Sequence, residues 1–189
     1  MVNQLTKAEK KNSVIFGAVA GIVSIIFSVM AIYHSRLAES YSSLYLVSTV
    51  LKIIGTILVP IGLVYFLKRK NNKVWTFSRA LQSIYIFLAT SIVLSAIGIT
   101  VFQKVLVDKA VLEESYQNLM NLKIVDMESR EATDVEIDQQ MEIIEQDRAF
   151  AFSEISFKNT VPPVFISLLI HFIYAMVLAL LFRDKIVEK

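Results

Sequence analysis

Four long apolar stretches, separated by polar segments, dominate the pattern of this 189-residue chain. Three of them each hold 24 consecutive residues without Asp, Glu, Lys or Arg. A helix of about 20 apolar residues crosses the roughly 30 Å hydrocarbon layer of a membrane. These stretches therefore predict membrane-spanning helices at about residues 13–35, 79–103 and 160–182.

The fourth apolar stretch, residues 44–67, is interrupted by one cation, Lys52. A lysine at the centre of a span costs about 2.5–3.5 kcal/mol on insertion scales. Lys52 lies nearer one end, where a long side chain can reach the headgroups while its stem stays in hydrocarbon. We therefore expect residues 44–67 to cross the membrane as well.

The polar segment before the last span is expected to be a helical hairpin. The 63 residues from Ile99 to Val161 contain no glycine or proline, whereas a flexible linker is normally rich in Gly, Pro or Ser. We expect span three to continue as a helix to about Leu122, followed by a turn over residues 126–131. A second helix would then begin at Thr133 and Glu136, which match a capping box.

Both arms of this hairpin carry stripes at helical spacing. The stripe residues are Leu112, Tyr116 and Leu119 on the outgoing arm, and Ile137, Met141, Ile144 and Arg148 on the returning arm. Two interpretations stay open. The stripes bury each other beneath a solvated acidic surface, or the hairpin is a docking arm for a partner or a second copy.

Composition agrees with a membrane protein. The chain is 55% hydrophobic and 19% charged, where soluble domains have about 45–50% and 25%. This excludes a disordered chain and an ordinary secreted domain. The expected fold is all-α: an integral membrane four-helix bundle with an extramembrane helical hairpin between spans three and four. Residues 1–189 form a single membrane domain, and residues 104–158 are an acidic insert on the outer side.

The distribution of charge predicts the orientation. Residues 104–158 contain 13 acidic and 6 basic residues, a net charge of −7, and the rest of the chain has 4 acidic and 13 basic residues, a net charge of +9. Basic residues mark the cytoplasmic side of membrane proteins. We therefore expect both termini in the cytoplasm and residues 104–158 outside, which is the periplasm in a cell with two membranes. A cleavable signal peptide ending near residues 29–31 is an alternative for span one, and it would leave the acidic segment outside.

Aromatic residues are expected near the two membrane–water interfaces, which Trp and Tyr favour. They are Tyr33, Tyr41 and Tyr45 at the outer edge, and Tyr65, Trp75 and Phe77 near the inner edge.

His171 is the first candidate for chemistry, because it lies halfway along the last span and an ionisable group at that depth is a candidate functional residue. A neutral histidine can equally be a structural hydrogen-bonding residue between helices. Thr56, Ser91 and Ser95 lie at similar depth. Pro60 leaves the Thr56 carbonyl without its helical donor, so we expect a kink in span two and a free carbonyl for a histidine N–H.

Lys52 is the second candidate. It would bind an anionic lipid or substrate, or would only extend toward the headgroups. The four apolar stretches hold no acidic residue, which weighs against a proton-coupled transporter.

Small residues form a candidate helix-packing face on span one: Gly17, Gly21, Ser24 and Ser28. The spacing of Gly17 and Gly21 lets two helix backbones approach closely. The face could serve packing inside the bundle or dimerisation.

Several classes of function are excluded or disfavoured. The chain has no cysteine, so disulfides, thiolate nucleophiles and cysteine metal sites are absent. It has no phosphate-binding glycine loop, zinc-protease motif or serine elbow, and its basic residues form no stripe for nucleic acid. We therefore expect no enzyme activity, no cofactor and no metal. The expected partners are membrane lipids and either a second copy or an envelope protein. The alternative is a small oligomeric transporter or channel that uses His171 and Lys52.

The order of features resembles a known family. A basic loop, Lys68–Lys73, precedes Thr76–Ala80 at the start of span three, and a charged helical insert then leads to Phe165–Leu181 and the closing Phe182–Lys185. This pattern, over roughly residues 14–187, resembles the domain-of-unknown-function family numbered 4199, small four-span membrane proteins found mainly in Bacteroidota. The family usually has a more glycine-rich turn where this chain has Asn71 and Asn72. The resemblance implies a bacterial inner (plasma) membrane location and no particular activity.

Overall fold

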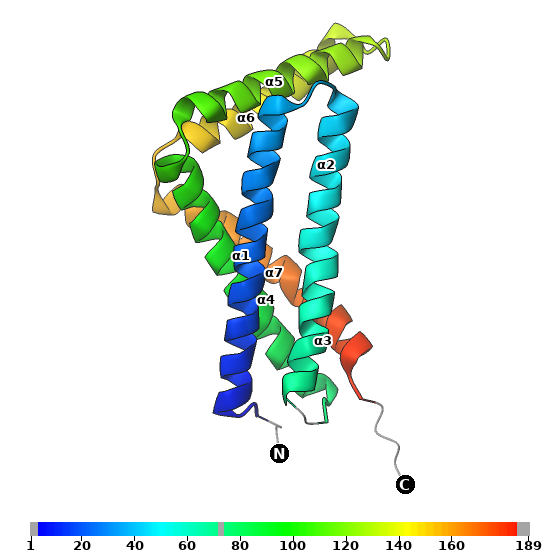
Figure 1. The fold of residues 1–189 in the computed structure, drawn as a ribbon, viewed down its shortest axis with the longest axis vertical. Coiled ribbons are helices and arrows are strands. Elements are labelled where there is room, and N and C mark those ends of the chain that lie inside the picture. Colours follow the sequence, from blue (N-terminus) through cyan, green and yellow to red (C-terminus); the bar gives the residue numbers. More distant parts are fainter. Residues whose placement is uncertain (1–3, 72–73, 185–189) are drawn as a thin grey trace. The chain divides into compact units, whose positions relative to one another are not determined.

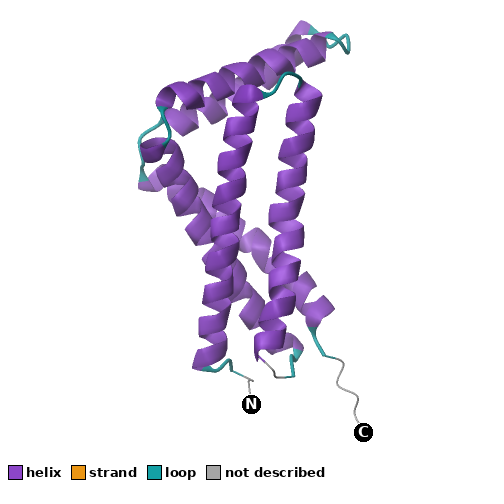
Figure 2. Cartoon of the chain, viewed as in Figure 1, coloured by secondary structure: helices purple, strands orange, loops and turns teal. Residues whose placement is uncertain are grey.

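The structure is a computed structural model that describes residues 4–71 and 74–184, in which all regular structure is helical (Figures 1 and 2). Asn72, Lys73 and Lys185, which carry part of the family resemblance, lie outside the described residues. Within the described residues, four helical stretches are long and apolar enough to cross a membrane, which confirms the predicted all-α membrane fold. They are Lys7–Leu37, Tyr41–Asn71, Phe77–Leu106 and Val161–Phe182.

Two of the four stretches contain a π-helical turn, the second in its middle and the third at its end. The second stretch consists of α2 (Tyr41–Ile53), the π-helical η1 (Ile54–Leu58) and α3 (Val59–Asn71), and the third of α4 (Phe77–Val101) and η2 (Phe102–Leu106). The first is α1 (Lys7–Leu37), and the last lies within α7 (Phe157–Phe182). The two hairpin arms are α5 (Lys109–Glu128) and α6 (Asp134–Phe152).

The chain forms two compact units. The first unit contains Met1–Ile25, Ile54–Gly98 and Phe157–Lys189, and the second contains Ile26–Ile53 and Ile99–Ser156.

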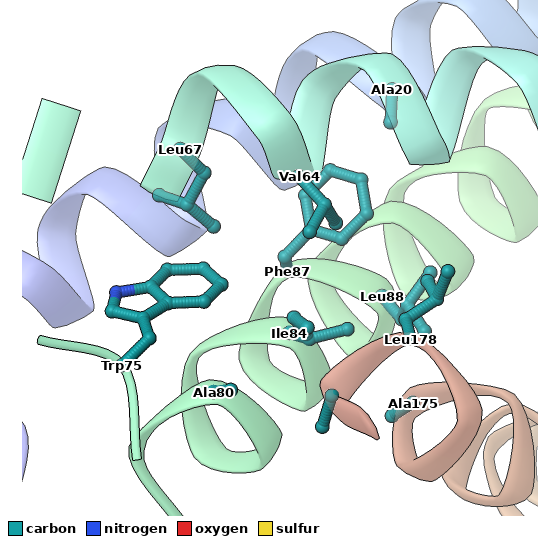
Figure 3. Packing of buried hydrophobic residues seen from close by; sticks show 11 residues of the cluster. Ala20, Val64, Leu67, Trp75, Ala80, Ile84, Phe87, Leu88, Ala175 and Leu178 are labelled. Carbon is teal, nitrogen blue, oxygen red and sulfur yellow. The ribbon is translucent and has the colours of Figure 1, made fainter. Parts of the chain in front are cut away.

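The core of the first unit lies where α1, α3, α4 and α7 meet around Trp75, as Figure 3 shows. Burying apolar side chains among helices gives dense packing in which a missing or added methyl group changes stability. The buried residues are Ala20, Val64, Leu67, Trp75, Ala80, Ile84, Phe87, Leu88, Ala175, Leu178 and Ala179.

Trp75, which we expected near the inner edge of the membrane, turns its side chain into the protein. Its side chain is completely buried. Its backbone N–H donates to a carboxylate oxygen of Asp184 over 2.7 Å, and its carbonyl accepts the N–H of Asp184 over 2.9 Å. These two bonds fix the segment before α4 against the end of α7, and the indole points inward toward Leu67 and Ile84 (Figure 3). Trp75 is therefore a core residue, and its position near the inner edge of the membrane stays a prediction.

Helices α1 and α4 approach each other closely at two glycines. A Cβ on Gly17 would clash with the Phe87 carbonyl oxygen, and one on Gly21 would lie 3.1 Å from the Ser91 carbonyl oxygen. Only residues without a side chain allow backbones to come this near. The side of α1 that carries Gly17 and Gly21 is thus covered by α4 of the same chain, while Ser24 and Ser28 are half-buried.

The chain departs from α-helical geometry beside Pro60, in the region where we expected a kink. The π-helical turn η1 ends at Leu58, two residues before Pro60. Proline cannot donate to a carbonyl one turn earlier, and a wider π-helical turn is one way in which a helix accommodates an interruption of its bonding ladder.

The expected continuous helix from span three to Leu122 is wrong. After η2 the chain becomes extended at Val107, and Asp108 begins a new helix by accepting the Ala110 N–H over 2.9 Å. The Lys104 ammonium stabilises this break between η2 and α5, because it donates to the Ser153 carbonyl after α6 over 2.5 Å. An aspartate that can cap a helix is a local start signal.

The hairpin itself follows the predicted pattern. Thr133 and Glu136 form the capping box, with the Thr133 N–H donating to the Glu136 carboxylate over 2.9 Å and the Glu136 N–H donating to the Thr133 hydroxyl over 3.4 Å. The turn before it contains Glu131, whose φ of 58° lies in the left-handed region.

Within the second unit, α5 also closes the end of α1. The Asn118 amide donates to the carbonyls of Ser35 over 2.8 Å and Ala38 over 2.9 Å, and the Ser115 hydroxyl donates to the Ile32 carbonyl over 3.0 Å. The last carbonyls of a helix have no partner within the helix, so the Asn118 amide takes the place of a local cap, and the Ser115 bond adds a second link between α5 and α1.

Substituting Gly17 by Ala is expected to destabilise the protein by about 1–3 kcal/mol, because the new methyl group would force the α1 and α4 backbones apart. The matched control is Gly62→Ala in α3, where an added Cβ meets nothing within 4 Å and the better helix propensity of Ala should leave stability equal or higher. Denaturant unfolding in detergent micelles, followed by circular dichroism, measures both. Equal stability of the two variants would contradict the close α1–α4 contact.

Candidate functional site

His171 bonds within its own helix. Its Nδ1 atom lies 2.8 Å from the Ser167 carbonyl oxygen. A carbonyl can only accept, so Nδ1 carries the proton in this bond. The His171 ring meets the Tyr174 ring edge to face at 6.3 Å, and the buried Tyr174 hydroxyl makes no hydrogen bond within the described part of the chain. The histidine N–H is therefore used in the last span itself rather than on the Thr56 carbonyl.

The other intramembrane candidates lie apart in the fold. Lys52 belongs to the second unit, and Thr56, Ser91, Ser95 and His171 belong to the first. Lys52 and Thr56 are exposed at the surface of their helices, while Ser91 and Ser95 are half-buried. The Ser95 hydroxyl donates to the Ile92 carbonyl of its own helix over 3.1 Å.

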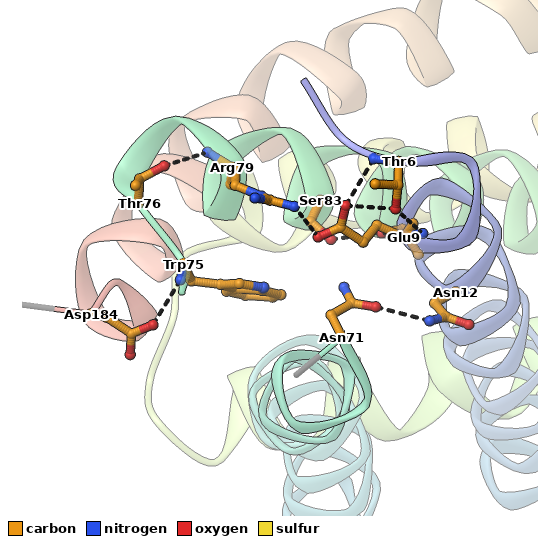
Figure 4. Close-up of polar contacts among 10 residues, drawn as sticks. Thr6, Glu9, Asn12, Asn71, Trp75, Thr76, Arg79, Ser83 and Asp184 are labelled. Atoms are coloured by element: carbon orange, nitrogen blue, oxygen red, sulfur yellow. Dashed lines mark hydrogen bonds and ion pairs between the residues drawn. The ribbon is translucent and has the colours of Figure 1, made fainter. Parts of the chain in front are cut away.

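The strongest concentration of buried polar groups lies at the end of the first unit where α1 begins, a place that we did not predict. Thr6 and Glu9 form a capping box: the Thr6 N–H donates to Glu9 Oε2 over 2.8 Å, and the Glu9 N–H donates to the Thr6 hydroxyl over 3.3 Å. The other carboxylate oxygen of Glu9 accepts from the Arg79 guanidinium over 2.6 Å (Figure 4). The Glu9 side chain is only 4% exposed and that of Arg79 only 14%, so this ion pair joins α1 to α4 away from water.

Two further polar pairs flank this ion pair. The hydroxyls of Ser13 and Ser83 lie 2.7 Å apart and join α1 to α4, and the Asn12 amide donates to the Asn71 side-chain carbonyl over 2.8 Å and joins α1 to α3. Asn71 Nδ2 and Arg79 Nε are buried and make no hydrogen bond in the described residues.

Asp184 is the centre of a second cluster on the same end of the first unit. Its carboxylate accepts from the Lys68 ammonium over 2.5 Å and from the Trp75 N–H over 2.7 Å. The hydrogen bond from Lys68 and the one from the Trp75 backbone hold the pKa of Asp184 below its usual range. Asp184 is therefore ionised at neutral pH and holds α3, the segment before α4 and the end of α7 together.

These clusters position helices. Their charged groups are engaged with one another, and among residues 4–71 and 74–184 no three His, Cys, Asp or Glu side chains are placed to hold a metal ion. One signal in the sequence could have revealed the first cluster, because Thr6 and Glu9 have the same spacing as Thr133 and Glu136. No local signal marks Asp184, since its partners lie 109 and 116 residues away.

Four apolar helical stretches and an acidic helical hairpin define an integral membrane protein whose buried polar residues tie its helices together at one end of a unit. Residues 15–184 match the family described as "Protein of unknown function (DUF4199)", and the chain belongs to that family. Comparisons with curated proteins and with solved structures found no match.

Removing one partner of the buried Glu9–Arg79 pair should lower the stability of the protein. Arg79→Gln leaves the Glu9 carboxylate buried without its cation, and we expect a loss of about 3 kcal/mol in unfolding free energy. The double variant Glu9→Gln with Arg79→Gln should lose less unfolding free energy than the sum of the losses in the two single variants, because it buries no unpaired charge.

The control for this cycle is Arg130→Gln, which breaks an ion pair to Asp126 whose arginine is 68% exposed and should cost at most about 1 kcal/mol. Denaturant unfolding in detergent measures all four variants. If Arg79→Gln costs no more than Arg130→Gln, the buried pair is not what secures α1 to α4.

Proposed function

We propose that this chain is a non-enzymatic assembly or accessory protein of the bacterial inner membrane. In this proposal the hairpin of α5 and α6 associates with a partner or with a second copy. The observation that carries the proposal is the outer face of α6. There Val135 and Ile143, two helical turns apart, are 65% and 53% exposed on an arm that is otherwise held firmly. Exposed aliphatic residues that a partner would cover gain free energy on association, because burial removes their apolar surface from water.

Contacts within the second unit support the rigidity of this arm. The Arg148 guanidinium makes two bonds to the Glu113 carboxylate, at 2.7 and 3.0 Å, and so joins α6 to α5. These bonds hold the pKa of Glu113 below its usual value, so the pair stays charged at neutral pH. Arg36 also pairs with Glu114, which joins α1 to α5. A preorganised surface loses little conformational entropy on binding.

Charge indicates the chemistry of the partner. Residues 134–152 of α6 contain six acidic residues and one basic residue, Arg148. A surface that meets this face would therefore carry apolar residues surrounded by basic ones, because complementary potentials favour encounter and orientation.

The proposed orientation places both termini in the cytoplasm and residues 104–158 in the periplasm. Its support is the excess of Lys and Arg outside the hairpin. Contacts add to it, since Glu9 near one terminus bonds to Arg79 in the first turn of α4, and Asp184 near the other bonds to Trp75 just before α4. The start of α1, the basic loop and the end of α7 therefore share one side.

Single cysteines can test this orientation without interference, because the chain has none of its own. Ser129→Cys in the hairpin turn should react with a membrane-impermeant maleimide in intact spheroplasts. Ala8→Cys at the start of α1 should react only after lysis. Both positions are exposed. Labelling of Ala8→Cys in intact spheroplasts would reverse the orientation.

The association itself is tested by gentle extraction of the full-length protein and mass spectrometry of what co-purifies. We expect a stoichiometric partner or a defined homo-oligomer that is lost in Val135→Glu and in Ile143→Glu. The matched control is Val125→Glu on α5, because Val125 is 63% exposed and Val135 is 65% exposed. The control should retain the complex.

Two results would count against the proposal. A monomeric protein that emerges alone would remove the assembly role, and transport assays on His171→Ala and Lys52→Ala would then test the transporter alternative. Equal loss of the complex in Val125→Glu and Val135→Glu would show that α6 is not the contact face.

A further inference from the structure

An open groove of about 650 Å³ lies between the end of α3 and the end of α7. It belongs wholly to the first unit. The proposed function makes no use of it. The side chains that matter here are Tyr65, Lys68, Arg69, Val74, Leu181 and Asp184.

The groove has one positive charge in excess. Lys68 and Asp184 neutralise each other as an ion pair. Arg69 instead lies over the Tyr65 ring, with its guanidinium carbon 5.6 Å from the ring centre, and has no acidic partner among the described residues. A guanidinium placed in this way keeps its fork of N–H donors available for a phosphate.

Lys68 can contribute a second donor. Its ammonium has three N–H groups, and two of them are used by the Phe182 carbonyl at 2.7 Å and the Asp184 carboxylate at 2.5 Å. These two bonds fix the position of the ammonium and leave one N–H for a ligand.

The rim of the groove is apolar. Val74 is 60% exposed and Leu181 is 70% exposed. The groove sits where the membrane-crossing stretches Tyr41–Asn71 and Val161–Phe182 end. Basic residues just beyond a span end attract anionic lipids, and exposed aliphatic residues beside them can contact acyl chains.

We propose that this groove binds the headgroup of an anionic phospholipid, with the phosphate on Arg69 and Lys68 and the acyl chains along Leu181. A small soluble phosphate compound would use the same two cations but would leave Val74 and Leu181 without a contact. The apolar rim therefore favours the lipid.

The single tryptophan of the chain provides the assay. Trp75 directly follows Val74, so a lipid carrying bromine atoms on its acyl chains quenches its fluorescence when it occupies the groove. The full-length protein is reconstituted in vesicles that mix phosphatidylcholine with dibrominated phosphatidylglycerol, and in the reverse mixture. We expect brominated phosphatidylglycerol to quench more than its mole fraction predicts, which brominated phosphatidylcholine should not do.

Variants distinguish a built site from general attraction to basic residues. Arg69→Gln should lower the relative binding constant for phosphatidylglycerol about fivefold, which corresponds to the interaction of one basic residue with an anionic surface, and Arg69→Lys should restore part of it. The matched control is Lys70→Gln. Lys70 loses the same charge one position further along α3, but its ammonium lies 5.9 Å from the centre of the Phe16 ring and does not line the groove. The Lys70→Gln variant should therefore keep the preference of the protein for phosphatidylglycerol over phosphatidylcholine.

Three outcomes would overturn the proposal. The first is equal quenching by the two brominated lipids in the unchanged protein. The second is an equal loss of the phosphatidylglycerol preference in Lys70→Gln and Arg69→Gln. The third is relief of the quenching by millimolar inorganic phosphate. This third outcome would assign the groove to a soluble phosphate compound. An unchanged emission maximum of Trp75 and an unchanged unfolding midpoint in Arg69→Gln exclude misfolding as the cause of a loss.

Discussion

Hydrocarbon offers a peptide group no hydrogen-bond partner, and this constraint organises the chain. It requires helices wherever the chain crosses the membrane, and it moves unpaired polar side chains to the ends of the spans or into pairs. Ser13 and Ser83 satisfy each other between α1 and α4, and the Thr90 hydroxyl donates to the Ile86 carbonyl of its own helix. Lipid provides no hydrophobic force between helices, so the close contact at Gly17 and the buried pair of Glu9 and Arg79 hold α1 against α4.

The parts of the fold that depend on local rules were predictable from the sequence. Span number follows from the length of apolar stretches, and the start of α6 follows from the spacing of Thr133 and Glu136. The helix expected to pass beyond residue 107 shows the limit of such rules. Two extended or capping residues, Val107 and Asp108, end it, and the contact of Lys104 with Ser153, 49 residues later, supports the bend.

The candidate site was harder to predict, because burial and pairing are properties of the folded chain. His171 and Lys52 attracted attention as ionisable residues in apolar surroundings. The paired charges that join helices lie instead at the margin of the spans, where sequence alone gives Arg79 and Asp184 no more weight than any other charged residue. Glu9 and Arg79 are 70 positions apart, so charge and hydropathy could identify each residue but not their pairing. Trp75 illustrates the same point, since its burial depends on Asp184.

The cap that Asn118 provides has a consequence for the order in which the protein matures. The carbonyls that it satisfies belong to Ser35 and Ala38, about 80 residues earlier in the chain. A growing chain contains α1 and α2 long before it contains α5. The first two spans are therefore made before the Asn118 bonds to the end of α1 can form, and that end acquires its cap only after residue 118 has been added to the chain and α5 has folded. During synthesis the first pair of spans therefore lacks the cap at the end of α1, and α5 of the hairpin supplies it later.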